Sequence, residues 1–133
     1  MFAEIFVALY LAHLAADYPL QTDWQAENKA DHSKEGWRAN LTHATTHVAV
    51  STAALAAGWW LAGWPLNPPG AIAALAWIGT SHSLIDRRRA VAWWMENTGQ
   101  VKYLANGGAA HVDQTAHLLA LGIAAAFITG GAS

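Results

Sequence analysis

Four apolar stretches of this chain each carry two ionisable side chains spaced four residues apart. The pairs are His13 and Asp17, His43 and His47, His82 and Asp86, and Asp113 and His117. On an α-helix, residues four apart lie one turn apart on the same face. The spacing therefore predicts helices, each presenting one polar pair along one face. The pattern disfavours strands, because the stretches lack polar–apolar alternation and are dominated by Ala and Leu.

The four stretches are apolar enough to predict membrane-spanning helices. The chain is 54% hydrophobic and 12% charged, whereas soluble domains have about 25% charged residues. A spanning helix needs about 20 residues, a length that the second stretch meets and the others approach. We expect an all-α fold, a four-helix transmembrane bundle in a single integral membrane domain over residues 1–133. The helices should cover roughly residues 2–17, 41–64, 70–86 and 112–130.

Residues around the stretches indicate where helices begin and end. Pro19 should end the first helix, and Asn40 should cap the start of the second. Thr22 and Gln25 form a capping-box pattern, which predicts a short surface helix. In the third loop, residues 90–96 place an aromatic pair beside a basic run, which predicts a short helix at the membrane interface.

The basic residues indicate which loops face the cytoplasm. All seven Lys and Arg side chains lie within residues 18–40 and 87–112, and the turn at 65–70 has none. Loops rich in Lys and Arg stay in the cytoplasm, so both termini and the short turn should lie outside. A net charge of −2 gives no basic field for nucleic acid. The absence of cysteine excludes disulfides and thiolate metal sites.

This topology brings all four polar pairs to the cytoplasmic ends of their helices. Ionisable groups inside a membrane are costly and usually face the bundle interior for function. Five imidazoles and three carboxylates suit a divalent metal and exceed what one ion needs, so we expect two ions that share a carboxylate. Nitrogen and oxygen ligands indicate zinc, with manganese, iron or nickel as alternatives. A purely hydrogen-bonded structural cluster is the competing interpretation.

The leading functional hypothesis is metal-dependent hydrolysis of a phosphoester or lipid-linked substrate. Bound metal lowers the pKa of a water molecule, and His111 or Asp113 would transfer protons. Arg87, Arg88 and Arg89 either clamp a substrate phosphate or only anchor the loop against the inner leaflet. The expected partners are therefore the lipid bilayer and an anionic substrate, and no nucleic acid.

Two other classes of function stay open. A metal or solute transporter would need polar groups toward the outer turn, and Ser51, Thr52 and Thr80 are the few present. A structural or host-interaction protein would use the metal only to hold a small bundle together. The sequence leaves the oligomeric state open.

The order of these motifs resembles a known family. "AHLAADYPLQTDWQAENK", "HATTH", "SHSLID" and "DQTAH" are similar to the DUF3307 family of small bacterial and phage membrane proteins. That resemblance implies the inner membrane of a bacterium and no assigned activity. More distantly, the chain resembles membrane-bound metal-dependent hydrolases, which implies His and Asp side chains within transmembrane helices. Residues 87–110 match no motif, so they indicate no substrate.

Overall fold

A computed structural model describes residues 1–130 of the protein, and every regular element in that range is a helix. The helices are α1 (Phe2–Asp17), α2 (Asp23–Asn28), α3 (Lys34–Ala62), α4 (Pro68–Asp86), α5 (Arg89–Asn97), α6 (Val101–Ala105) and α7 (Ala109–Thr129). The all-α prediction is confirmed.

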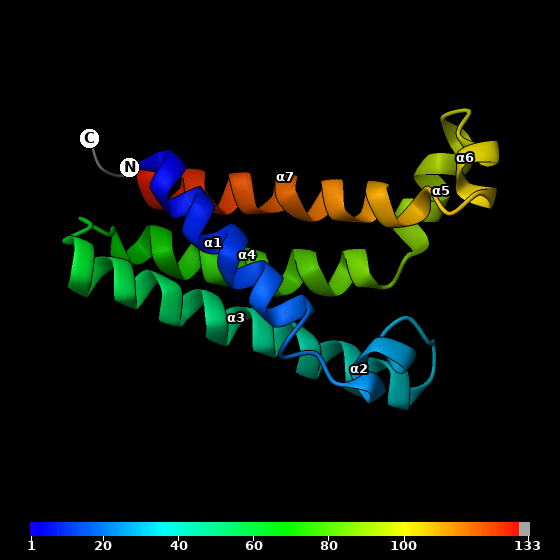
Figure 1. Ribbon diagram of the computed structural model, residues 1–133, viewed down its shortest axis with the longest axis horizontal. Coiled ribbons are helices and arrows are strands. Elements are labelled where there is room, and N and C mark those ends of the chain that lie inside the picture. The colour runs from blue at the N-terminus through cyan, green and yellow to red at the C-terminus, as the bar shows by residue number, and fades with distance from the viewer. Residues whose placement is uncertain (131–133) are drawn as a thin grey trace.

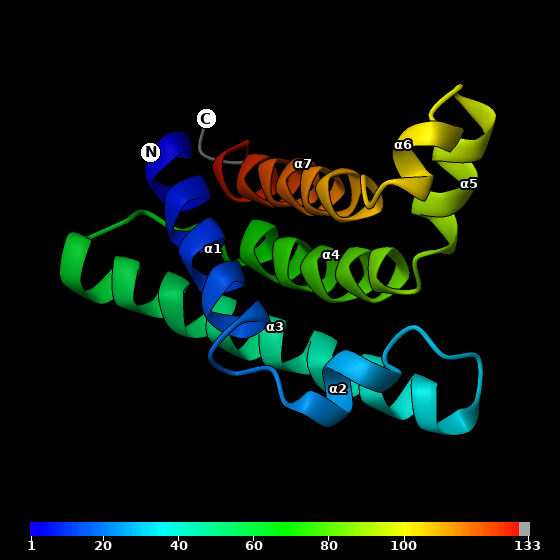
Figure 2. The ribbon, with the colours of Figure 1, turned by 45° about the vertical axis from the view of Figure 1, so that its right-hand side comes forward.

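Four long helices form the body of the molecule. α3, α4 and α7 run side by side, and α1 lies across them, packed against α3 and α7 (Figure 1). The start of α1 and the end of α7 lie at the same end of the bundle as the α3–α4 turn. The short helices α2, α5 and α6 lie at the opposite end, which we call the loop end (Figures 1 and 2).

The second long helix begins earlier than the sequence pattern indicates. α3 starts at Lys34, where Ser33 accepts a hydrogen bond from the Gly36 amide at 3.0 Å. The predicted start at residue 41 and the predicted cap at Asn40 are both wrong, because Asn40 lies fully buried inside the helix. The apolar pattern identified only the part of α3 that packs against the other long helices. The first turns of α3 are more polar, so the pattern did not include them.

The short helices follow local sequence signals. At the start of α2, the Thr22 hydroxyl accepts from the Gln25 amide at 3.2 Å, and the Gln25 side chain accepts from the Thr22 amide at 3.0 Å. The predicted capping box is therefore present. α5 contains the predicted interfacial segment, and it buries Val91 and Met95 while exposing Trp93 and Trp94. α6 was not predicted.

The interior of the bundle has two chemically different halves. Toward the termini lies an apolar core of Ile5, Leu9, Leu55, Ala74, Ile78, Leu121, Ala124, Ala125 and Ile128. Toward the loop end the buried side chains are polar, and they include His13, Asn40, His43, His47, His82, Ser83, Asp86 and His117. The same four helices supply both halves.

The outer surface of the bundle is rich in large apolar side chains. Examples come from each long helix: Leu11 of α1, Leu41 of α3, Leu84 of α4 and Leu119 of α7 are all more than half exposed. Among the described residues, α7 is the one helix long and apolar enough to cross a membrane, by length and composition. α1 has 16 residues, about 24 Å of helix, less than the roughly 30 Å of a bilayer core. A bundle of four spanning helices therefore stays a prediction.

Candidate metal centre

The polar pairs of all four long helices meet at one level of the bundle. The five histidines His13, His43, His47, His82 and His117 are at most 3% exposed. Their rings pack directly against one another, with ring centroids only 3.5 Å apart for His47 and His82. The structure thus brings together seven of the eight predicted ligands, and Asp113 is the exception.

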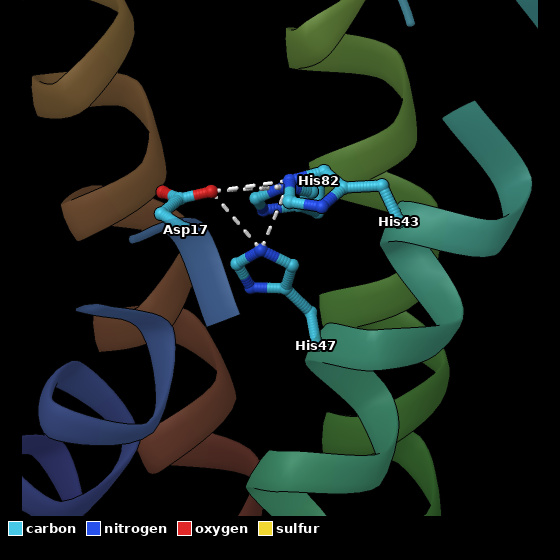
Figure 3. Close-up of side chains that lie close together, drawn as sticks. All are labelled: Asp17, His43, His47 and His82. Atoms are coloured by element: carbon cyan, nitrogen blue, oxygen red, sulfur yellow. Dashed lines mark hydrogen bonds and ion pairs between the residues drawn. The ribbon is translucent and has the colours of Figure 1, made fainter. Parts of the chain in front are cut away.

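One group of ligand atoms gathers around the carboxylate of Asp17 (Figure 3). Its Oδ1 atom lies 3.1 Å from Nε2 of His43 and 3.1 Å from Nε2 of His47. The two Nε2 atoms are 3.3 Å apart, and Nε2 of His82 lies 3.9 Å from the same oxygen. Four tetrahedral ligands at about 2.0 Å from a metal are about 3.3 Å from one another. This group therefore has the spacing of a metal site.

A second group gathers around Asp86. Its Oδ2 atom lies 3.2 Å from Nε2 of His82, and its Oδ1 atom lies 3.8 Å from Nε2 of His117. These three residues can also hold an ion, so His82 belongs to both groups. The remaining histidine, His13, has its Nε2 atom 3.0 Å from Oδ2 of Asp17. The Asp17 carboxylate thus turns one oxygen toward each side of the cluster.

Several of these buried atoms make no hydrogen bond within the protein. They are Nε2 of His13, His82 and His117, and Oδ2 of Asp86. Each imidazole nitrogen lies within 3.8 Å of a carboxylate oxygen, but the angles are not those of a hydrogen bond. An unsatisfied buried polar atom costs about 1–3 kcal/mol. Ligand atoms that converge on a shared centre without bonding one another are what a cation would satisfy, so the residues fit a metal.

Lys29 enters the same cluster from outside the bundle. Its Nζ atom lies 3.0 Å from Oδ2 of Asp86 and 3.2 Å from Nε2 of His43. The sequence places Lys29 at the end of a surface helix and does not indicate this contact. The link depends on how α2 folds back onto α3, and no local pattern encodes that path. Its ammonium lies in the region where the Asp86 group would hold an ion.

Asp113 lies behind a ligand and not among the ligands. Its Oδ2 atom is 3.4 Å from Nδ1 of His117, and its carbonyl oxygen is 3.0 Å from the same nitrogen. It is 24% exposed. A partner on Nδ1 turns Nε2 inward and fixes the tautomer of a ligating histidine. His111 is exposed and stacks on Tyr103, with ring centroids 6.2 Å apart.

A buried polar pair adjoins the cluster and was also missed by sequence reasoning. Asn40 of α3 donates to the Ser83 carbonyl of α4 at 3.0 Å, and the Ser83 hydroxyl donates to the Asn40 side-chain oxygen. Each residue lies next to or near a histidine in sequence, but the pairing spans two helices. The pair fixes α3 against α4 beside His43 and His82.

The three predicted phosphate contacts have different surroundings. Arg87 is buried, and its guanidinium lies 4.3 Å from the centre of the Trp37 ring. Arg89 is exposed and donates to His32 at 3.0 Å. Arg88 is exposed and has the left-handed φ of 60° at the start of α5. An Arg87 nitrogen also lies 2.9 Å from Nδ1 of His32. Arg87 and Arg89 therefore share His32 as a neighbour.

Comparison with known protein families gives one match. Residues 5–132 match the family described as "Protein of unknown function (DUF3307)". No curated protein and no solved structure matches the chain. The match covers nearly the whole chain, including every residue of the cluster.

Proposed function

This chain belongs to the DUF3307 family, whose function is unknown, and from its buried cluster we propose that it is a metal-dependent hydrolase of the membrane. One observation carries the proposal. Imidazole nitrogens and carboxylate oxygens from four helices converge at metal-ligand spacing, and several of them lack any hydrogen bond. Burying such groups without a cation would be costly, so the arrangement is best explained as a binding centre.

Two ions would divide the ligands between them. Asp17, His43 and His47 would hold the first ion, since their ligand atoms already lie within 3.3 Å of one another. The second takes Asp86 and His117. His82 completes one of these sites but not both, because a single Nε2 atom serves one ion at a time. His13, beside the second oxygen of Asp17, is then available to the other site.

The composition of the cluster favours zinc, with manganese, iron and nickel as alternatives. All ligand atoms are nitrogen or oxygen, and no sulfur is present. Lys29 adds a positive charge beside Asp86, where it competes with the second ion. A single ion with Lys29 in place is therefore the state expected at low metal concentration.

Hydrolysis follows from the charge of a loaded centre. Bound divalent metal supplies a water molecule with a pKa near neutral. Two dications would outweigh the three carboxylates of Asp17, Asp86 and Asp113, which favours hydroxide and an anionic substrate. Asp113, partly exposed behind His117, is the group we assign to proton transfer. His111 stacks on Tyr103, and we assign it no role in proton transfer.

A membrane setting is supported by the outer surface. Large apolar side chains are exposed on all four long helices, and continuous exposed apolar surface marks contact with lipid or with a partner. Trp59 and Trp60 are exposed near the α3–α4 turn, and Trp93 and Trp94 near the loop end. We propose that the bundle lies in the bacterial inner membrane with the loop end in the cytoplasm. Cysteines placed at Asn67 and Asn106 test this: a reagent outside the cell should label only the first.

The test of the function combines metal analysis with a substrate screen. The protein is purified in detergent, and metal per chain is measured by mass spectrometry. Phosphomonoesters, phosphodiesters and phospholipids are then offered with and without chelator. Hydrolysis that chelator abolishes and added metal restores supports the proposal. Absence of bound metal after purification from metal-rich medium would refute it.

A structural role for the metal is the second candidate, and the closure of the cluster favours it. All five imidazoles are at most 3% exposed, so a substrate reaches them only if part of the surrounding protein moves. Stoichiometric metal with no turnover in the screen selects this candidate. Transport has less support, because Thr52 and Thr80 are exposed on the outside of the bundle and only Ser51 faces its interior.

A further inference from the structure

A buried guanidinium at the loop end has no anionic partner in the protein. Arg87 is 8% exposed, and buried arginines are normally paired with a carboxylate. Among the ion pairs formed within residues 1–130, Lys29 is the one Lys or Arg side chain that takes part. Arg87 instead donates to the Lys29 carbonyl at 3.3 Å and lies on the Trp37 ring. Its position is fixed, but its charge is not neutralised.

A second guanidinium converges on the same place. Nδ1 of His32 lies 2.9 Å from an Arg87 nitrogen, and Nε2 of His32 lies 3.0 Å from Nε of Arg89. A neutral imidazole has one nitrogen that accepts a hydrogen bond and one that carries a hydrogen. It therefore cannot accept from both arginines. His32 is a poor partner for two guanidinium groups, and an anion with several acceptor oxygens would be a better one.

The nearest acid in sequence does not fill this role. The Asp31 carboxylate accepts a hydrogen bond from the Ser33 hydroxyl at 2.8 Å. That bond, with backbone bonds from residues 32 and 33, lowers the pKa of Asp31 below its ordinary value. Asp31 is thus charged but engaged at the start of α3. Neither Arg87, which is buried, nor Arg89, which is exposed, has a carboxylate partner within residues 1–130.

The site adjoins the candidate metal centre. Arg87 directly follows Asp86, and Lys29 contacts Arg87 through its carbonyl and Asp86 through its ammonium. These contacts join the end of α4 to the segment after α2, at the loop end of the bundle (Figure 2). Side-chain and backbone contacts therefore link exposed His32, through Arg87 and Lys29, to the buried carboxylate of Asp86.

We propose that Arg87 and Arg89 bind a phosphoryl group. The His32 side chain would rotate away to give its place between the two guanidinium groups to the phosphoryl oxygens. Two guanidinium groups can grip its oxygens in the bidentate manner that arginine favours. The inference rests on the proposed function, because it names the group that the substrate of the hydrolase carries. The same chemistry is offered by a soluble phosphomonoester and by a phosphomonoester lipid headgroup. Arg88 is exposed and makes no hydrogen bond to His32, so it is not part of the site.

The experiment measures binding separately from hydrolysis. Full-length protein in detergent, with its metal content determined, is titrated with inorganic phosphate by calorimetry. It is also placed in phosphatidylcholine nanodiscs with and without phosphatidic acid, to distinguish a soluble source of phosphate from a lipid source. Arg89→Gln should weaken phosphate binding about tenfold or more, because it removes a charge-assisted contact. Arg87→Gln should do at least as much.

Arg88→Gln is the matched control, since it removes the same charge from the neighbouring position. It should leave the affinity within about twofold of the wild type. An equal loss in Arg88→Gln and Arg89→Gln overturns the proposal, because diffuse charge would then explain binding. So does unchanged affinity in Arg89→Gln, an exposed position where folding is not at risk. Metal retained with no phosphate binding defeats the phosphoryl site alone, whereas phosphate bound without metal defeats the metal centre alone.

Discussion

The two halves of the bundle are built by the same four helices on different principles. In the half near the termini, Leu9, Leu55 and Ile78 bury apolar area and need only compatible shape. In the half near the loop end, His47 and His82 are equally buried but have Nε2 atoms aimed at shared carboxylates. Apolar contact is non-directional, whereas ligand contact depends on direction. A substitution that damages apolar packing should therefore lower the free energy of unfolding, whereas a substitution of a ligand should lower the affinity for metal.

The largest expected effect separates the halves on a single helix. His47 and Leu55 lie on the buried face of α3, eight residues apart. His47→Ala should lower metal affinity more than about a hundredfold, because it removes a ligand and not a supporting group. Leu55→Ala should cost about 2–5 kcal/mol of stability and leave metal per chain unchanged. Mass spectrometry of metal and chemical denaturation provide both readouts.

The comparison breaks if the two substitutions act alike. Full metal content in His47→Ala would show that the polar half is a satisfied core without a bound ion. Loss of metal in Leu55→Ala, measured on folded protein, would show that the halves do not act independently.

Removal of metal is the next largest effect. A ligand present at a thousand times its dissociation constant stabilises the fold by about 4 kcal/mol, so chelator should lower the melting temperature of the wild type. Imidazoles titrate near pH 6.5 when free, and bound metal excludes their protons. The metal-derived stability is therefore present above that pH and is lost as the pH falls. Leu55→Ala should keep this chelator-sensitive, pH-dependent increment, and His47→Ala should lack it.

A smaller effect is expected at Asp113, which supports His117 from behind. Asp113→Asn should lower metal affinity about 10–100-fold, the usual cost of losing a partner of a ligating histidine. Asp17→Asn, of equally conservative shape, should abolish binding at the first ion site because it removes a ligand oxygen. The two variants are compared by metal titration. Equal losses would place Asp113 among the ligands after all.

The smallest effect tests polar residues that are not ligands. Ser83→Ala should cost about 1–3 kcal/mol, because it leaves the buried side-chain oxygen of Asn40 without its hydroxyl donor, and it should keep full metal. Thr45→Ala, an exposed position whose hydroxyl bonds only to its own helix, should change stability by less than about 0.5 kcal/mol. Thermal melts with and without chelator distinguish these outcomes. Metal loss in Ser83→Ala would extend the centre to the Asn40–Ser83 pair.

The sequence predicted the four long helices and the convergence of their polar pairs at one end of the bundle. Spacing of four residues identified a helical face, and the distribution of Lys and Arg identified which helix ends meet. The family resemblance is confirmed by the match over residues 5–132. Helical spacing cannot say which member of a pair points inward, and so it grouped Asp113 with the ligands.

The contacts missed by sequence reasoning all connect distant segments. Lys29 reaches Asp86, Asn40 reaches Ser83, and Arg87 reaches His32. Each contact depends on how a loop or helix packs against another element, and a local sequence pattern does not predict that packing. Their residue types also resemble ordinary surface or capping residues. A three-arginine run, for instance, is typical of a membrane anchor until one of its members is found buried.

The distribution of the cluster over the four long helices has a consequence for biosynthesis. The N-terminal helix supplies His13 and Asp17, but α7, the last of the four to be made, supplies His117. A chain still on the ribosome therefore holds imidazoles and carboxylates that have not yet met their partners. Under the proposed function, metal loading would be a late event that follows completion of the bundle. Until α7 is made, the polar faces of the earlier helices lack the partners that it supplies.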